Sequence, residues 1–152
     1  MITACDIRLA TDNAVFCVKE ADLAIVADMG TLQRLPTIVG HGAASELALT
    51  ARDFSGMEAK ELRLVSQAYP SQEALMAGAT AMARAIAAKS PLAVCGTKRV
   101  LLYQRRAVED HSVADGLDYV ATWNSAMLPQ SADVQEVFLA RAQRRRPNFS
   151  RL

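Results

Sequence analysis

The sequence predicts an α/β chain in which a mixed region of short strands and helices precedes a mostly helical region. Short β-branched segments with partial alternation occur before residue 20, whereas helical spacing of apolar residues prevails beyond Pro70. Hydrophobic residues make up 51% of the 152 residues and aromatic residues only 5%, which indicates a core of alanine, leucine and valine. We therefore divide the chain into residues 1–69 and residues 70–152.

Charge, hydropathy and cysteine content argue against several classes of function. Basic residues number 17 and acidic residues 16, so we expect no nucleic-acid surface. No apolar run approaches the ~20 residues that a membrane span requires, and the N terminus shows no signal peptide. The spacing of Cys5, Cys17 and Cys95 is not that of metal ligands, so we expect reduced, buried thiols and no metal site. Together these features predict an intracellular soluble protein.

The first region combines extended segments with short helices. Residues 2–10 and 14–18 are predicted strands, the second of them buried, with turn chemistry at 11–13. The predicted helices cover residues 30–35 and 43–49, followed by one that begins at 56. Pro36 and residues 40–42 are expected to separate the first two, and Ser55 and Glu58 have the spacing of a capping box for the third.

The second region is predicted to contain four alanine-rich helices. Their ranges are about 71–88, 91–105, 113–127 and 133–145. Ser71 and Ser90 stand where N-cap residues are expected, and Pro91 suits the first turn of the second helix.

Two acids, Glu20 and Asp28, bracket an apolar run. Their separation of eight positions corresponds to about 12 Å along a helix or about 26 Å along a strand. Neither geometry brings both carboxylates to one small substrate, so a shared site requires the segment to fold back as a loop. We expect Leu23, Ile25 and Val26 to be buried around the acids. The alternative, from the residues alone, is a surface loop with scattered acids.

Several segments resemble the enoyl-CoA hydratase/isomerase, or crotonase, superfamily. They are residues 5–8, 16, 19–20, 30–35, 39–40, 46–52, 64–66 and 89–94. The resemblance covers nearly the whole chain. It implies a partial crotonase-like strand–strand–helix spiral over residues 1–69 and a helical oligomerisation region over 70–152. One departure is Arg63, where relatives commonly place glycine, so we expect a different turn or modest strain there.

The acid at position 28 distinguishes branches of this superfamily. Hydratases resemble the chain at Glu20 but usually carry glycine where Asp28 stands. The dienoyl-CoA isomerase branch carries both acids, and residues 117–124 resemble it too. The resemblance implies conversion of 3,5-dienoyl-CoA to 2,4-dienoyl-CoA in unsaturated fatty-acid β-oxidation. Asp28 would take the C2 proton and Glu20 would deliver one at C6. An enoyl-CoA hydratase and a non-catalytic truncated assembly module stay open as alternatives.

Further roles follow from the same resemblance. Met29 and Leu32 are expected to line the acyl pocket, with core packing as the alternative. Phe138 and Arg141 resemble a Phe-x-x-Lys/Arg pattern that contacts the adenine and phosphate region of CoA, although a solvated helix end is an alternative for the arginine. CoA is part of the acyl-CoA substrate, so no separate cofactor is expected. Relatives form trimers that are often paired into hexamers, so we expect a homo-oligomer.

The last three residues, Ser150, Arg151 and Leu152, resemble the S-K-L peroxisomal address. A receptor reads this address, which does not act as an anchor. Together with the resemblance to acyl-CoA enzymes, it predicts an import receptor as a partner. The expected location is a peroxisome or a related organelle such as the glycosome.

The 152 residues resemble only the carboxyl-terminal part of the superfamily's domain. Relatives carry a glycine-rich turn and a third acid immediately before the position of Met1. That turn supplies oxyanion-hole donors, each of which is typically worth ~100- to 1,000-fold in rate. We therefore expect little catalysis from this chain alone. Either an upstream half exists in the natural gene, or another subunit covers the apolar strands that would otherwise be exposed.

Overall fold

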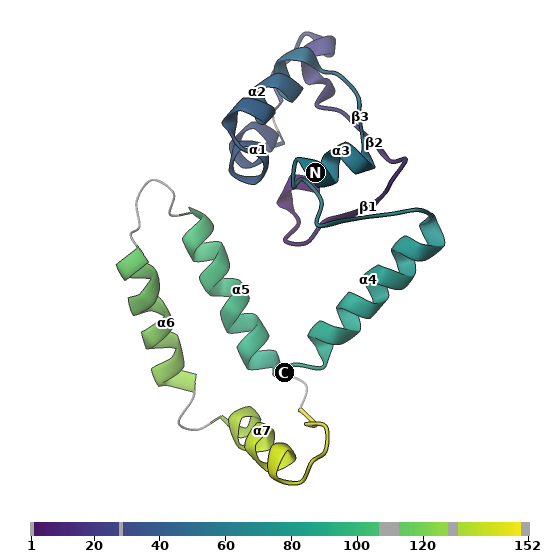
Figure 1. The fold of residues 1–152 in the computed structure, drawn as a ribbon. Helices are drawn as coiled ribbons and strands as arrows, with labels where there is room; N and C mark the ends of the chain where they lie inside the picture. The colour runs from purple at the N-terminus through teal and green to yellow at the C-terminus, as the bar shows by residue number, and fades with distance from the viewer. Residues whose placement is uncertain (1, 28, 107–112, 128–130, 150–152) are drawn as a thin grey trace. The chain divides into compact units, whose positions relative to one another are not determined.

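The computed structural model describes residues 2–27, 29–106, 113–127 and 131–149 (Figure 1). The chain is mixed α/β, as the sequence predicts. Its contacts divide it into two compact units, Met1–Ala81 and Met82–Leu152. The division falls within the helix α4 (Gln72–Ala87).

The strands of the first unit are short and pair two by two. In one pair β1 (Leu9–Thr11) runs parallel to β4 (Gln67–Tyr69), and in the other β2 (Val15–Phe16) runs antiparallel to β3 (Phe54–Ser55). The prediction of a buried strand at 14–18 is wrong in its extent and at Val15, which is 71% exposed. Successive side chains of a strand point to opposite faces, and because Phe16 packs against the core, Val15 points away from it.

The N-terminal segment also departs from its prediction. Residues 2–10 were expected to be one strand, but η1 (Ile2–Ala4) is a single 3-10 turn and only the end of the segment is extended. Thr3 is 3% exposed, and its hydroxyl accepts a hydrogen bond from Arg34 Nε at 3.1 Å. Packing of this buried threonine against α1 therefore overrides the β propensity of the segment.

The remaining elements of the first unit are helical. They are η2 (Lys19–Leu23, a 3-10 helix), α1 (Thr31–Val39), α2 (His41–Thr50), α3 (Gly56–Glu61) and the first part of α4. The prediction that Pro36 ends the first helix is wrong. Pro36 lies in the second turn of α1, where it removes only the bond to the Leu32 carbonyl. The helix ends at the predicted Gly40, whose φ of 85° suits glycine, while His41 and Gly42 already belong to α2.

Apolar side chains from the helices and strands of the first unit form one core. Its buried members are Ala10, Val18, Leu35, Ala44, Leu47, Phe54, Ala59, Leu64 and Val65. Leu47 of α2 is 0% exposed, and Val65, just before β4, is 1% exposed. The rings of Phe16 and Phe54 stack across β2 and β3 with centroids 5.5 Å apart. Alanine, leucine and valine thus supply most of the core, as the composition indicates.

Two predictions for the residues around α3, the cap at Ser55 and the strained turn at Arg63, are confirmed. Ser55 Oγ accepts a hydrogen bond from the Glu58 N–H at 3.1 Å, which is the predicted cap. Arg63 has a φ of 61°, so the turn after α3 carries the strain expected where relatives place glycine. Arg52 joins α2 to α3, because its Nε contacts Glu46 at 2.8 Å and its Nη2 contacts Glu58 at 2.5 Å.

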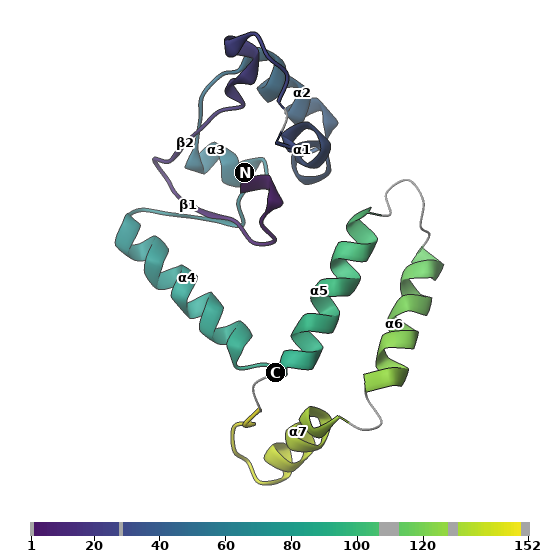
Figure 2. The same cartoon turned by 180° about the vertical axis from the view of Figure 1, so that it is seen from behind.

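The second unit is helical, as predicted. It contains α5 (Pro91–Arg106), α6 (Val113–Met127) and α7 (Ala132–Ala142). Figures 1 and 2 show α5 and α6 side by side, joined by stacking of Tyr103 on Tyr119 with ring centroids 4.7 Å apart. Ser71 Oγ accepts from the Ala74 N–H and Ser90 Oγ from the Ala93 N–H, which confirms both predicted caps.

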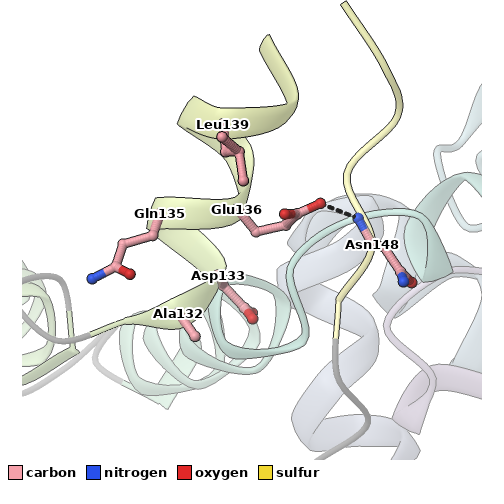
Figure 3. Close-up of a pocket in the computed structure, with 6 residues that line it drawn as sticks. All are labelled: Ala132, Asp133, Gln135, Glu136, Leu139 and Asn148. Carbon is pink, nitrogen blue, oxygen red and sulfur yellow. Dashed lines mark hydrogen bonds between the residues drawn. The ribbon is translucent and has the colours of Figure 1, made fainter. Parts of the chain in front are cut away.

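A carboxylate on α7 holds the segment that follows this helix (Figure 3). Glu136 accepts hydrogen bonds from Arg145 Nη1 at 2.5 Å and Nη2 at 2.9 Å, and from the Asn148 N–H at 2.6 Å. The prediction that the helix reaches residue 145 is wrong, because Arg144 has a φ of 52° and turns the chain back. Glu136 and Asn148 also line a pocket of about 520 Å³.

The cysteines differ from expectation. Cys5 and Cys95 are exposed and only Cys17 is half-buried, so the prediction of buried thiols is wrong for the first two. Cys17 Sγ donates to the Ala51 carbonyl at 2.9 Å, and burial raises the pKa of this thiol. Among the described residues, no three His, Cys, Asp or Glu side chains lie together in a way that could hold a metal ion. None of the described helices combines the length and hydropathy needed to cross a membrane.

The close approach of α3 to β1 yields a stability prediction. A Cβ at Gly56 would lie 1.8 Å from the Thr11 carbonyl oxygen, so the backbone must move to accept any side chain. We expect Gly56→Ala to lower the free energy of unfolding by about 1–3 kcal/mol in a urea titration. Gly42→Ala is the matched control, because nothing lies within 4 Å of its Cβ. Equal unfolding free energies for the two variants would contradict this packing.

The hydrogen bonds that Glu136 accepts from Arg145 and the Asn148 N–H, here called the Glu136 clamp, predict how protection of this segment depends on pH. Arg145 and the Asn148 N–H lower the pKa of Glu136 to about 2, from an ordinary 4.5. A lowered pKa in the folded state means that the clamp stabilises above about pH 4.5 and is lost as the pH falls towards about 2. We expect the protection of the Asn148 amide against hydrogen exchange to follow this window. Glu136→Ala, which removes both acceptor oxygens, should remove the protection at neutral pH, and Glu61→Ala, an exposed control, should retain it.

Candidate active site

An apolar pocket forms in the first unit where η2, α1 and α2 meet. Its volume is about 180 Å³. The lining residues are Val18, Glu20, Ala21, Ile25, Val26, Ala27, Leu32, Ala48 and Leu49. Among these, Glu20 alone carries an ionisable side chain. The pocket therefore places one carboxylate beside an otherwise apolar wall.

The position of Glu20 follows from how the chain enters and leaves η2. Val18 is 8% exposed and belongs to the core, so it anchors the chain just before the turn. The Ile25 N–H donates to the Glu20 carbonyl at 3.1 Å, and Ala24 adopts a left-handed φ of 57°. Asp22, on the same turn, does not line the pocket but is exposed and paired with Lys19. Glu20 is left half-buried at the pocket.

The apolar run after Glu20 behaves only partly as predicted. The segment does fold back, because a 3-10 turn and then irregular backbone replace a continuous helix or strand. The prediction that its apolar residues are buried is wrong. Leu23 is 63% exposed, Ile25 56% and Val26 76%. Ile25 and Val26 nevertheless line the pocket, so their exposed side chains border its opening.

The two residues predicted to line an acyl pocket differ in position. Leu32, in the first turn of α1, lines the pocket together with Glu20. Met29 is 61% exposed and is not a lining residue of this pocket. Its carbonyl accepts a hydrogen bond from Arg34 Nη2 at 2.6 Å. Asp28, the second predicted acid, lies outside the described residues.

The remaining predicted residues belong to the second unit or to its end. Phe138 is 67% exposed on α7, and Arg141 is exposed in the last turn of the same helix. Neither lines the α7 pocket shown in Figure 3. Ser150, Arg151 and Leu152 lie outside the described residues. Phe138 and Arg141 belong to a different compact unit from Glu20, so a role for them at the same site stays a prediction.

Sequence reasoning missed the contribution of α2. Ala48 and Leu49 line the pocket of Glu20, and they also line a second pocket of about 230 Å³ between α1 and α2. Leu32 is common to both pockets as well. The one signal in the sequence is that Ala44 and Ala48 are four residues apart and so lie on one face of a helix, a spacing that does not by itself indicate a pocket.

The geometry suits proton transfer to or from an apolar molecule. A carboxylate can act as general acid or base when it lies within hydrogen-bonding reach of the reacting atom. Glu20 lines a cavity whose other walls are aliphatic, so a molecule bound in this cavity would lie beside its carboxylate. The aliphatic walls favour a hydrocarbon chain over a polar ligand.

Comparison with known proteins agrees with this chemistry. The sequence pattern described as "Enoyl-CoA hydratase/isomerase" matches residues 1–151. The chain is 58% identical, over its full 152 residues, to a peroxisomal delta(3,5)-delta(2,4)-dienoyl-CoA isomerase of Arabidopsis thaliana, and covers 53% of that protein. It is 47% identical to the mitochondrial enzyme of the same name from Homo sapiens, over 90% of this chain and 41% of the human protein. The chain thus spans about half the length of these curated relatives.

Two solved structures give the same result for the fold. An enoyl-CoA hydratase from Bacillus anthracis superposes with a TM-score of 0.87 at 31% identity, over 97% of this chain and 55% of that one. An enoyl-CoA hydratase from Mycobacterium tuberculosis superposes with a TM-score of 0.81 at 33% identity, over 97% of this chain and 56% of that one. Because the family's sequence pattern matches residues 1–151, the chain belongs to the enoyl-CoA hydratase/isomerase family.

Proposed function

We propose that this protein is a dienoyl-CoA isomerase, which moves the double bonds of a 3,5-dienoyl-CoA to give a 2,4-dienoyl-CoA in the β-oxidation of unsaturated fatty acids. The observation that carries the proposal is Glu20, a half-buried carboxylate on an apolar pocket of about 180 Å³. The names of the relatives that are 58% and 47% identical to the chain support the same reaction.

The reaction requires two proton transfers at opposite ends of the diene. Loss of a C2 proton to Asp28 leaves its electron pair delocalised over the diene and the thioester carbonyl. Delivery of a proton from Glu20 to C6 then completes the 2,4-diene. Both acids are needed, because one carboxylate cannot reach carbons that lie four bonds apart in an extended chain. CoA enters as part of the substrate, so the reaction requires no further cofactor.

Substitution of each acid, in the protein as the cell makes it, tests the proposal. We expect Glu20→Gln and Asp28→Asn each to slow formation of the conjugated dienoyl thioester by about 100-fold or more, since general acid–base catalysis contributes ~100- to 10,000-fold. The rate is read from the ultraviolet absorbance of the product. Asp22→Asn is the matched control, because Asp22 lies on the same 3-10 helix but does not line the pocket.

A second substrate separates the isomerase from a hydratase. A hydratase adds water to a 2-enoyl-CoA and needs Glu20 but no acid at position 28. If Asp28→Asn isomerises at the wild-type rate while Glu20→Gln loses hydration of a 2-enoyl-CoA, the isomerase proposal is wrong and the hydratase is correct. If the wild-type protein turns over neither substrate, an assembly role replaces both.

We further propose that the protein acts in a peroxisome-type organelle as a homo-oligomer, a trimer or a hexamer. The name of the Arabidopsis thaliana relative supports this location, and so does the sequence Ser150-Arg151-Leu152. The Homo sapiens relative is named mitochondrial, so the mitochondrion is the alternative location. The import receptor that reads a C-terminal tripeptide would then be a partner.

Imaging of a fluorescent fusion distinguishes the locations. With the fluorophore at the N terminus, we expect peroxisomal fluorescence that becomes diffuse when residues 150–152 are deleted. Deletion of residues 147–149 with the tripeptide kept in place is the control and should remain peroxisomal. Mitochondrial fluorescence of the protein with its natural N terminus would contradict the assignment.

A further inference from the structure

A second pocket continues the pocket of Glu20 along the helices α1 and α2. Its volume is about 230 Å³, and three residues, Leu32, Ala48 and Leu49, line both pockets. A site for a small molecule usually has a volume of ~300 Å³ or more. Neither pocket reaches that volume alone, whereas the two together exceed it. The second pocket, here called the α1–α2 groove, therefore extends the first.

The turn between the two helices creates this groove. Gly40 follows α1 and precedes α2 with a φ of 85°, a conformation that favours glycine. Its N–H donates to the Pro36 carbonyl at 3.0 Å, and its carbonyl accepts from the Ala44 N–H at 3.1 Å. The turn brings α2 into contact with α1, so that Pro36 of one helix and Ala44 of the other line the same groove.

Small side chains on α2 leave the space of the groove open. Ala44 and Ala48 are four residues apart, so both lie on the face of α2 that borders it. Ala44 is 5% exposed and Leu35 of α1 is 2% exposed, so the inner wall belongs to the core of the unit. The groove is therefore a product of core packing.

The groove leads away from Glu20 along α2. Ala48 borders the pocket of Glu20 as well as the groove, whereas His41 borders the groove alone. The seven residues between these positions rise about 10 Å along a helix. At C–C bonds of about 1.5 Å, an extended tail of about eight carbons covers the same distance. His41 is exposed, so the aliphatic lining gives way to a polar side chain at this end.

We propose that the α1–α2 groove binds the hydrocarbon tail of the acyl-CoA beyond C6, and that Ser45 helps to determine which tail lengths the protein prefers. The inference rests on the function proposed above, in which Glu20 delivers a proton to C6. With C6 beside Glu20, the carbons that follow require an apolar space that opens from the same pocket. The groove provides it, because Leu32 and Ala48 are common to both and its walls are mainly aliphatic.

Substrates of two lengths test the proposal in the protein as the cell makes it. The tail beyond C6 has two carbons in 3,5-octadienoyl-CoA and eight in 3,5-tetradecadienoyl-CoA. Because each buried methylene group contributes about 4-fold to affinity, we expect the kcat/KM of the wild-type protein to be about 10-fold or more higher for the longer substrate. Ser45 lines the groove but not the pocket of Glu20, so Ser45→Leu should lower this ratio about 10-fold or more.

Two further variants control for general damage to the fold. Thr37→Leu should keep the wild-type ratio, because Thr37 is exposed on α1 and lines neither pocket. His41→Leu extends the apolar wall and should raise the ratio by about 4-fold, a gain that loss of structure cannot produce. A wild-type ratio in Ser45→Leu would overturn the proposal. If Ser45→Leu does not fold, His41→Leu decides, since an increased ratio supports the proposal and an unchanged ratio overturns it.

Binding of acyl-CoAs that cannot isomerise separates this proposal from the proposed function. Octanoyl-CoA and tetradecanoyl-CoA have no double bonds, and isothermal titration calorimetry measures their affinities. We expect the wild-type protein to bind tetradecanoyl-CoA about 10-fold or more tightly than octanoyl-CoA, and Ser45→Leu to lose this difference. Equal wild-type affinities for the two lengths would overturn the proposal. If the wild-type protein isomerises neither dienoyl-CoA, the isomerase function fails, and the ratio of affinities still decides whether the groove binds the tail.

Discussion

Burial of α2 is the constraint on which the candidate site depends. Leu47 is 0% exposed, and the helix that carries it contacts both α1 and η2. The pocket of Glu20 is the space left where these elements meet, so its walls exist only while α2 is held in the core. Arg52 secures the carboxyl end of this helix through Glu46 and Glu58, and the Ala51 carbonyl just beyond it accepts from Cys17. None of the residues that make these bonds lines the pocket.

The sequence predicts well the features that depend on neighbouring residues. The capping serines at 55, 71 and 90 make the expected bonds, and the helices they begin are present. Prediction fails where a distant contact decides. Thr3 forms a 3-10 turn because it is buried near Arg34, and the chain leaves the α7 axis after Ala142 because Glu136 binds Arg145. Neither contact has a periodic signature in the sequence.

The candidate site shows the same division. Glu20 and Leu32 are twelve residues apart and meet at one pocket because the intervening chain folds back, which the spacing of the acids required. The exposure of Leu23 and Val26 was not predicted, since apolar composition alone does not say what covers a side chain. The α2 wall of the pocket was missed because alanine at helical spacing is typical of any packed helix. The residue type at the site was therefore easier to predict from the sequence than the exposure of the side chains around it.

A crystal structure of the natural protein with a bound, non-isomerisable dienoyl-CoA analogue tests the central claim most directly. The claim is that the carboxylate of Glu20 faces the far end of the diene inside the aliphatic pocket. We expect a Glu20 oxygen about 3–3.5 Å from C6, as a reactive arrangement requires, with Leu32 and Ala48 in contact with the acyl chain. An analogue bound elsewhere, with Glu20 directed into solvent, would contradict the account.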